Sequence, residues 1–121
     1  MAFDRTLHVR VLDALSRRDD TSDRWMFGGV CFLVGGHMAC GILGDELIVR
    51  VGEDAFPEAM REPHTRLFDF TGRPMRGWVV VGPEALATKA GLARWVARGV
   101  AFAESLPPRQ ATRPLPPRRA D

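Results

Sequence analysis

The residues of this chain that could do chemistry lie close together in the stretch RWMFGGVCFLVGGHMACGILGDELIVRV, Arg24 to Val51. The stretch holds Cys31, His37 and Cys40. Cysteine and histidine are common zinc ligands, and two cysteines can also form a disulfide. The glycine-rich part lacks both the Lys-Ser/Thr pair of a phosphate-binding P-loop and the spacing of a dinucleotide fingerprint. The choice between metal, disulfide and plain structure depends on the elements that position these side chains.

Two tight turns predict that this stretch is an antiparallel sheet. Gly35-Gly36 separates two apolar runs, and Gly44-Asp45 suits a type II′ turn because its first residue is glycine. The register that follows places Cys40 opposite Cys31 in the first hairpin and opposite Val49 in the second. The other predicted pairs are Leu33 with Met38, Val34 with His37, Ile42 with Leu47 and Leu43 with Glu46.

This register sorts the side chains onto two faces, because successive residues of a strand point to opposite sides. One face is wholly apolar and is the expected core: Cys31, Leu33, Met38, Cys40, Ile42, Leu47, Val49 and Val51. The other face is mixed and holds Val30, Phe32, Val34, His37, Ala39, Gly41, Leu43, Glu46, Ile48 and Arg50. Its apolar centre needs covering and is the candidate interface, formed by Phe32, Val34, Leu43 and Ile48.

The same register bears on the possible chemistry. Both cysteines point into the core face while His37 points away, so we expect neither a metal nor another cofactor. A Cys31–Cys40 disulfide remains an alternative, because a non-hydrogen-bonded pair brings the Cα atoms to about 4.5 Å. The serines are not placed beside a histidine by any motif, and we expect no catalytic residue and no enzyme.

The flanking sequence predicts three helices and a third hairpin. The fold class is therefore α+β in two layers, an antiparallel sheet with helices packed on one face, in the order α-βββ-α-ββ-α. The last helix carries an apolar stripe of Leu92, Trp95, Val96, Gly99, Phe102 and Ala103. The first helix is expected over 5–16, capped by Asp4, with Leu7, Val11, Leu12 and Leu15 on its apolar side, and a polar linker follows over 17–23. A short helix is expected over 52–61, with Pro57 in its first turn, and a hairpin over 65–81, with its turn at 71–74. The last helix is expected over 82–106, with a break near Thr88.

Three arginines around the third hairpin form the only candidate polar site. Arg66, Arg73 and Arg76 could make a lip that binds an anion or a partner. The alternative is that they are solvated strand residues paired with Asp69 or Glu62.

Composition and charge bound the function. Of the 17 basic and 15 acidic side chains, the segment after Leu106 takes four and one, which leaves 13 and 14, or −1, for the body. We expect one domain over 1–106 and a disordered Pro/Arg-rich tail over 107–121, in which Pro114 and Pro117 are spaced as in a proline-rich ligand. Nucleic-acid binding is not expected of the body and is conceivable only through the tail. With no membrane-length apolar run and no signal sequence, a cytoplasmic location is expected.

The chain from Trp25 to Leu106 resembles the N-terminal domain of the TfoX/Sxy family of bacterial competence regulators. The resemblance rests on MFGG (Met26 to Gly29), then FLVGGHM, GDELIVRV, FTGRPM, GWVVV and LARWVARGVAFAESLP in order. It implies a two-layer fold of the secretion-chaperone-like kind and supplies no catalytic residues. The founding regulators carry a second, helical domain, which is not expected here because only 16 residues follow Ser105.

These observations favour a non-enzymatic protein-interaction or regulatory module. We expect a homodimer formed through the Phe32, Val34 and Ile48 face, because a symmetric pair would bury that patch twice. The alternatives are a nucleic-acid-associated competence regulator and a small-molecule binder.

Overall fold

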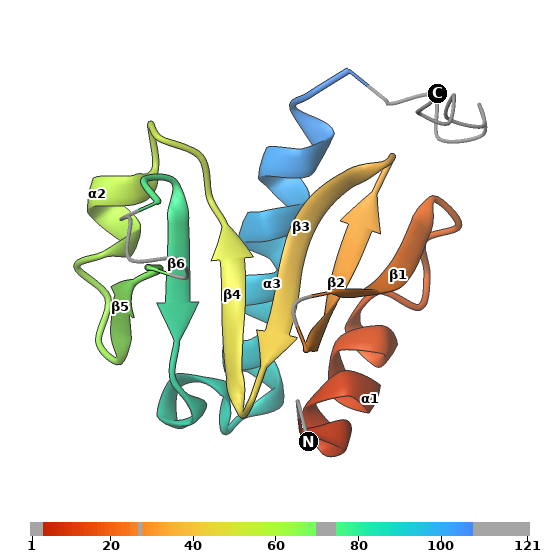
Figure 1. The fold of residues 1–121 in the computed structure, drawn as a ribbon, viewed down its shortest axis with the longest axis horizontal. Coiled ribbons are helices and arrows are strands. Elements are labelled where there is room, and N and C mark those ends of the chain that lie inside the picture. The colour runs from red at the N-terminus through yellow and green to blue at the C-terminus, as the bar shows by residue number, and fades with distance from the viewer. Residues whose placement is uncertain (1–3, 27, 70–74, 108–121) are drawn as a thin grey trace.

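The computed structural model describes residues 4–26, 28–69 and 75–107, and it shows a six-stranded antiparallel sheet in the order β1-β2-β3-β4-β6-β5 (Figure 1). This confirms the predicted α+β class. The elements are α1 (Arg5–Ala14), β1 (Thr21–Met26), β2 (Gly29–Val34), β3 (His37–Leu43), β4 (Glu46–Arg50), α2 (Phe56–Ala59), β5 (Thr65–Leu67), β6 (Trp78–Val81), the 3-10 helix η1 (Pro83–Leu86) and α3 (Lys89–Glu104).

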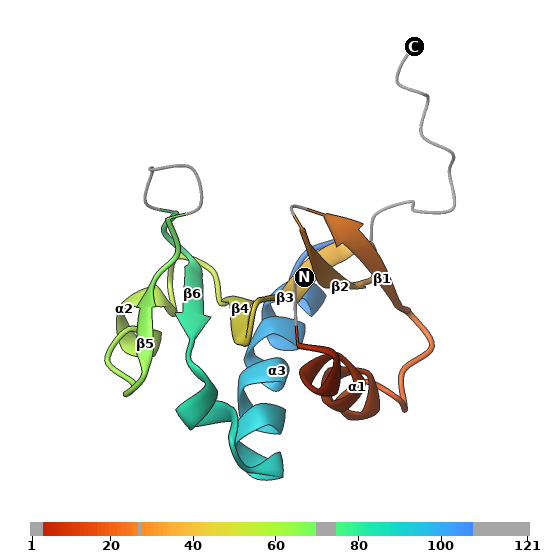
Figure 2. The same ribbon diagram turned by 60° about the horizontal axis from the view of Figure 1, so that its bottom comes forward.

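The main core lies between the sheet and the helices α1 and α3, which pack on the same side of it (Figure 2). Trp95 of α3 is fully buried there, and Phe56 of α2 packs in the same core. The predicted apolar stripe of α3 is buried except for Phe102, which is half-buried. In α1, Leu12 is 43% exposed, so its predicted place on the apolar side was wrong; the buried side chains are Leu7, Val11 and Leu15.

Both α1 and α3 begin at a side-chain cap, of which Asp4 was predicted as a cap and Thr88 as a break. Asp4 accepts hydrogen bonds from the backbone N–H groups of Thr6 and Leu7, at 2.8 and 3.1 Å, and so begins α1. Thr88 accepts one from Gly91 N at 2.9 Å, which explains the predicted break between η1 and α3.

Both predicted turns are present. Gly35 and Gly36 have φ of 60° and 85°, as a type I′ turn requires, and Gly44 has φ of 64° at the first position of the second turn. The pairing of β3 with β4 is as predicted, including Cys40 opposite Val49. The turn at 71–74 lies outside the described residues, although β5 and β6 on either side of it pair antiparallel as predicted.

The pairing of β2 with β3 departs from the prediction at a β-bulge. Leu33 lies opposite Met38 as predicted, but Phe32 then lies opposite Cys40, so Ala39 is an extra residue in β3. Cys31 consequently pairs with Gly41 and not with Cys40.

The bulge reverses the predicted facing of the inner part of β2. Val30 and Phe32 pack in the main core, and Val34 packs with Ala39 and Ala103 in a smaller cluster against α3. Cys31, Leu33 and Met38, predicted for the core face, lie on the opposite face. The core-face residues from Cys40 to Val51 are placed as predicted.

One strand was missed. The predicted linker over 17–23 contains the start of β1, which pairs with β2 and forms one edge of the sheet. On β1, Asp23 Oδ2 lies 3.3 Å from His8 Nε2 of α1, and Trp25 is 68% exposed. The sequence of this edge strand is mostly polar, and apolar and polar residues do not alternate along it. The usual pattern of a strand is therefore missing, which is why the segment was predicted to be a linker.

Candidate functional site between α1 and α3

The four residues of the predicted interface do not share a surface. Phe32 and Val34 are 0% and 2% exposed and pack toward the helices, whereas Leu43 and Ile48 lie on the opposite face of the sheet. The bulge at Ala39 is the physical reason, because it moves the side chains of β2 to the other face. The predicted interface is therefore corrected.

We call the sheet face opposite α1 and α3 the open face. Within the described part of the chain no helix packs on it (Figure 2). Its apolar residues are nevertheless well covered by their neighbours in the monomer. Cys31, Ile48 and Val80 are at most 7% exposed, and Leu33, Met38 and Leu43 are half-buried.

Arg66 and Arg76, the two described arginines of the predicted polar lip, contact different partners and do not form a common site. Arg66 forms an ion pair across the open face with Glu46, with Nη2 2.6 Å from Oε1. Arg76 lies over the ring of Phe56, with its Cζ 5.5 Å from the centroid. Arg73 lies outside the described residues. Arg66 is thus a paired surface residue, but its partner is neither Asp69 nor Glu62.

The two cysteines cannot act together. Cys31 lies on the open face, where its Sγ is 3.6 Å from the carbonyl oxygen of Arg24, while Cys40 lies in the main core. Because they point to opposite faces, they can share neither a disulfide nor a metal ion. Burial raises the pKa of the Cys40 thiol to about 12 and also raises that of Cys31. Both are buried, free thiols.

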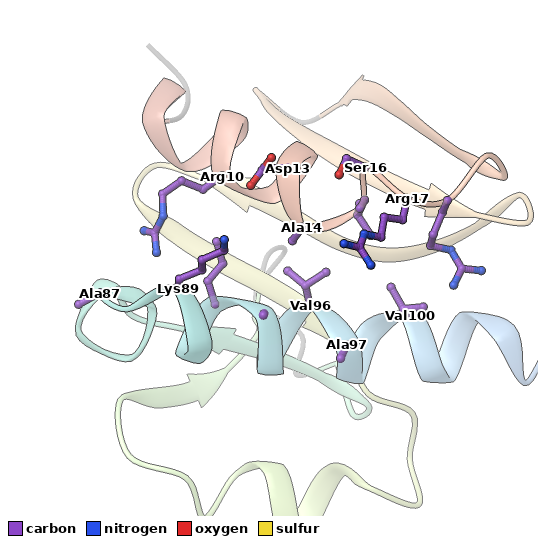
Figure 3. A pocket seen from close by; sticks show the side chains of 14 residues that line it. Arg10, Asp13, Ala14, Ser16, Arg17, Ala87, Lys89, Val96, Ala97 and Val100 are labelled. Atoms are coloured by element: carbon purple, nitrogen blue, oxygen red, sulfur yellow. The ribbon is translucent and has the colours of Figure 1, made fainter.

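A groove of about 950 Å³ lies between α1 and α3 (Figure 3). We call it the α1–α3 groove. Its floor is apolar, formed by Leu15, Leu92 and Val96, each at most 4% exposed. Alanines line its sides, namely Ala14, Ala93 and Ala97.

Arginines bridge the two helices at both ends of the groove. Arg10 of α1 donates to the carbonyl oxygens of Leu86 and Thr88, at 2.7 and 3.3 Å, next to the start of α3. Arg18, which follows α1, lies 2.7 Å from Glu104 at the end of α3. The hydrogen bonds from Arg18 to Asp20 and Glu104 raise the pKa of its guanidinium. These contacts link α1 and the segment after it to the two ends of α3.

The rim of the groove is basic. Arg17 and Lys89 are exposed at its edges. Neither forms an ion pair with another described residue. The one acidic lining residue is Asp13, also exposed. Among the described lining residues Ser16 is the only one with a hydroxyl group, and none is a histidine or cysteine that could activate it. This arrangement, an apolar floor with a mainly basic rim, suits the binding of a partner.

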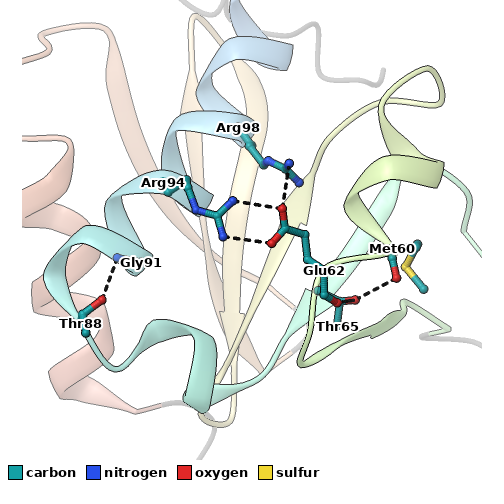
Figure 4. Close-up of polar contacts among 7 residues, drawn as sticks. All are labelled: Met60, Glu62, Thr65, Thr88, Gly91, Arg94 and Arg98. Atoms are coloured by element: carbon teal, nitrogen blue, oxygen red, sulfur yellow. Dashed lines mark hydrogen bonds and ion pairs between the residues drawn. The ribbon is translucent and has the colours of Figure 1, made fainter.

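A second polar cluster lies on the other side of α3 (Figure 4). Glu62 accepts hydrogen bonds from Arg94 at 3.1 and 3.2 Å and from Arg98 at 3.3 Å, and both guanidinium groups lie over the ring of Trp95. The hydrogen bonds from Arg94 lower the pKa of Glu62 from its ordinary value. This cluster ties the segment after α2 to α3, and every charge in it has a partner.

Sequence reasoning did not find the groove. The only available signal was a few alanines off the apolar stripes, namely Ala14 in α1 and Ala93 and Ala97 in α3. Alanine is also the commonest filler of helix surfaces, so this signal could not have been separated from ordinary helix propensity. The groove depends on which two helices become neighbours, and that is decided by the sheet between them.

The molecule thus belongs to the two-layer α+β proteins, with helices on one face of an open antiparallel sheet. The family model for the TfoX N-terminal domain matches residues 13–103, and the chain belongs to this family. The match runs from Asp13, near the end of α1, to Ala103 in the last turn of α3, and so covers the described lining residues of the groove except Arg10. Comparison with curated proteins and with solved structures found no match. None of the described helices is long and apolar enough to cross a membrane.

Proposed function

We propose that this domain is a non-enzymatic protein-interaction module and that the α1–α3 groove is its docking site. The observation that carries the proposal is the distribution of polarity in the groove. The buried floor is apolar and the charges stand only at the rim, which is the usual anatomy of a protein–protein interface. The competence-regulating role of the family and a cytoplasmic location are parts of the same proposal.

The dimensions support a protein segment as the occupant. The α3 wall runs from Lys89 to Val100, which at 1.5 Å per residue is a length of about 17 Å. A groove of that length with an apolar floor matches a peptide segment better than it matches the phosphates of a nucleic acid, which need a continuous charged surface. The arginines of the tail, on which the nucleic-acid alternative rests, lie outside the described residues.

Affinity purification from bacterial lysate, quantified by mass spectrometry, tests the proposal. Ala97→Glu fills the groove with a longer, charged side chain at an exposed position, so the fold should survive. Ala90→Glu is the matched control, because Ala90 is exposed on the same helix and does not line the groove. We expect proteins that are captured by the wild type and by Ala90→Glu and lost with Ala97→Glu. Partners retained equally by all three would refute the groove as the docking site.

A second candidate is self-association through the open face. The observation in its favour is that no described helix covers this face, where Leu33, Met38 and Leu43 are half-buried. Light scattering at micromolar concentration should then give a dimer that Leu33→Glu or Leu43→Glu dissociates. A wild-type monomer would remove this candidate.

A further inference from the structure

We propose that the occupant of the α1–α3 groove is an acidic amphipathic helix of about three turns, supplied by another protein. This inference rests on the proposed function and adds the chemistry of the partner. It follows from the shape, the charge and the surroundings of the groove.

The shape of the groove fits a helix. Arg10 contacts the start of α3 and Arg18 contacts its end, so the two walls run in the same direction along the groove. A helix lying between two others packs its side chains into the spaces between theirs, at an interaxial distance of about 8–10 Å. The small side chains of Ala14, Ala93 and Ala97 leave room for that approach. The length of about 17 Å corresponds to three helical turns, and helix-in-groove docking is an established mode of peptide recognition.

The charge of the rim selects an acidic partner. Arg10, Arg17 and Lys89 face the groove against the single acidic Asp13, while Arg18 is already paired with Asp20 and Glu104. Lys89 is the first residue of α3 and Arg17 lies in the turn that follows α1, so the two cations stand toward opposite ends of the groove (Figure 3). A matching helix therefore has an apolar stripe at i, i+3, i+4 and i+7 spacing, with Glu or Asp beside it at both ends.

The same charges argue against the chain's own tail as the occupant. After Leu106 the chain has four arginines and one aspartate, a charge of the same sign as the rim. Like charges brought together disfavour binding. The partner is therefore another protein that carries acidic residues.

Peptide display with the full-length protein tests this inference. A library of random 16-residue peptides is selected on the wild type, and the best peptide is synthesised with a fluorescent label for titration. We expect the selected sequences to show the apolar stripe with flanking acidic residues, and circular dichroism to show helix formation on binding. Replacing the acidic residues of the peptide by glutamine should weaken binding about three- to tenfold, because rim ion pairs contribute modestly.

Variants of the protein locate the site. Arg17→Glu and Lys89→Glu should each weaken binding about three- to tenfold, and Ala97→Glu by more than tenfold. Arg5→Glu is the matched charge reversal, because Arg5 is exposed on α1 and does not line the groove. It should leave the affinity within about twofold. Folding of each variant is checked by its melting temperature.

Several results would overturn the inference. They are selection of proline-rich, basic or extended peptides, binding that Ala97→Glu leaves intact, or no enrichment of any peptide. The proposed function is judged separately, by whether Ala97→Glu loses captured proteins in the purification described above. A groove-dependent partner that docks through anything other than an acidic helix would leave the proposed function standing and refute this inference.

Discussion

Gly99→Ala tests the packing of α3 against the bulge in β3, on which the position of the α3 wall of the groove depends. A Cβ atom built on Gly99 would lie 2.3 Å from the carbonyl oxygen of Ala39 and 3.4 Å from a methyl group of Val49. The first contact is with backbone, so no side-chain rotation can relieve it. The variant must push α3 away from β3 or distort the bulge.

Two effects of opposite sign decide the outcome. Alanine is favoured over glycine inside a helix by about 1 kcal/mol. Overpacking in a close-packed interior costs about 1–3 kcal/mol, and the rigid backbone contact at Gly99 places this site at the upper end. We therefore expect Gly99→Ala to destabilise the protein by about 1–2 kcal/mol, which lowers the melting temperature of a domain of this size by about 4–8 °C.

Urea unfolding followed by circular dichroism measures the change. Ala97→Gly is the control, because Ala97 is exposed in the middle of α3 and reports the helix propensity alone; it should cost about 1 kcal/mol. If Gly99→Ala proved as stable as the wild type or more so, α3 would not approach Ala39 as closely as described.

Three further predictions concern the core, the ion-pair cluster and the thiols. Trp95→Ala should destabilise the fold by about 3–5 kcal/mol, because Trp95 is fully buried in the main core; an unchanged melting temperature would contradict that position. Glu62→Gln should cost about 1 kcal/mol at pH 7, because the hydrogen bonds from Arg94 that lower its pKa stabilise the folded state only while Glu62 is ionised. This difference should shrink as the pH falls below the ordinary carboxyl pKa of 4.5 and through the lower folded value, and a difference independent of pH would contradict the ion pairs. Cys40 should react with a thiol reagent at pH 8 only at the rate of unfolding, since burial raises its pKa to about 12; fast labelling of folded protein would show that it is accessible.

Much of the fold could be predicted because turns and caps leave local signals. Gly35-Gly36 and Gly44-Asp45 indicated two hairpin turns, and Asp4 indicated the start of α1. The break predicted near Thr88 coincides with the start of α3. The pairing of β3 with β4 followed correctly from its turn. These features need only neighbours in sequence, so no tertiary information was required.

The facing of β2 could not be predicted, because both faces of β2 and β3 are apolar. A core that contains Phe32 and one that contains Cys31 give equally apolar faces, so the hydrophobic pattern of the strand cannot show which residue faces the core. The bulge at Ala39, which decides this, leaves no signal in the hydrophobic pattern. The bulge is explained by tertiary packing, since Ala39 contacts α3 where Gly99 allows the closest approach. The candidate interface was misplaced for the same reason.

The candidate site was also beyond the reach of local patterns. Its walls are α1 and α3, which are separated by more than seventy residues in the chain, and its ends are closed by Arg10 and Arg18 through contacts with distant residues. On each helix alone, the basic and alanine positions look like an ordinary solvated face.

Site-specific photocrosslinking in living bacteria tests the central claim most directly. A photoreactive amino acid at Ala97 places the probe in the α1–α3 groove, and the same amino acid at Arg66, which is exposed on the open face, is the control. We predict that illumination links position 97 to a different protein through an acidic segment, and that position 66 does not give this product. Crosslinking of position 66 alone, or of position 97 only to a second copy of this chain, would contradict the account.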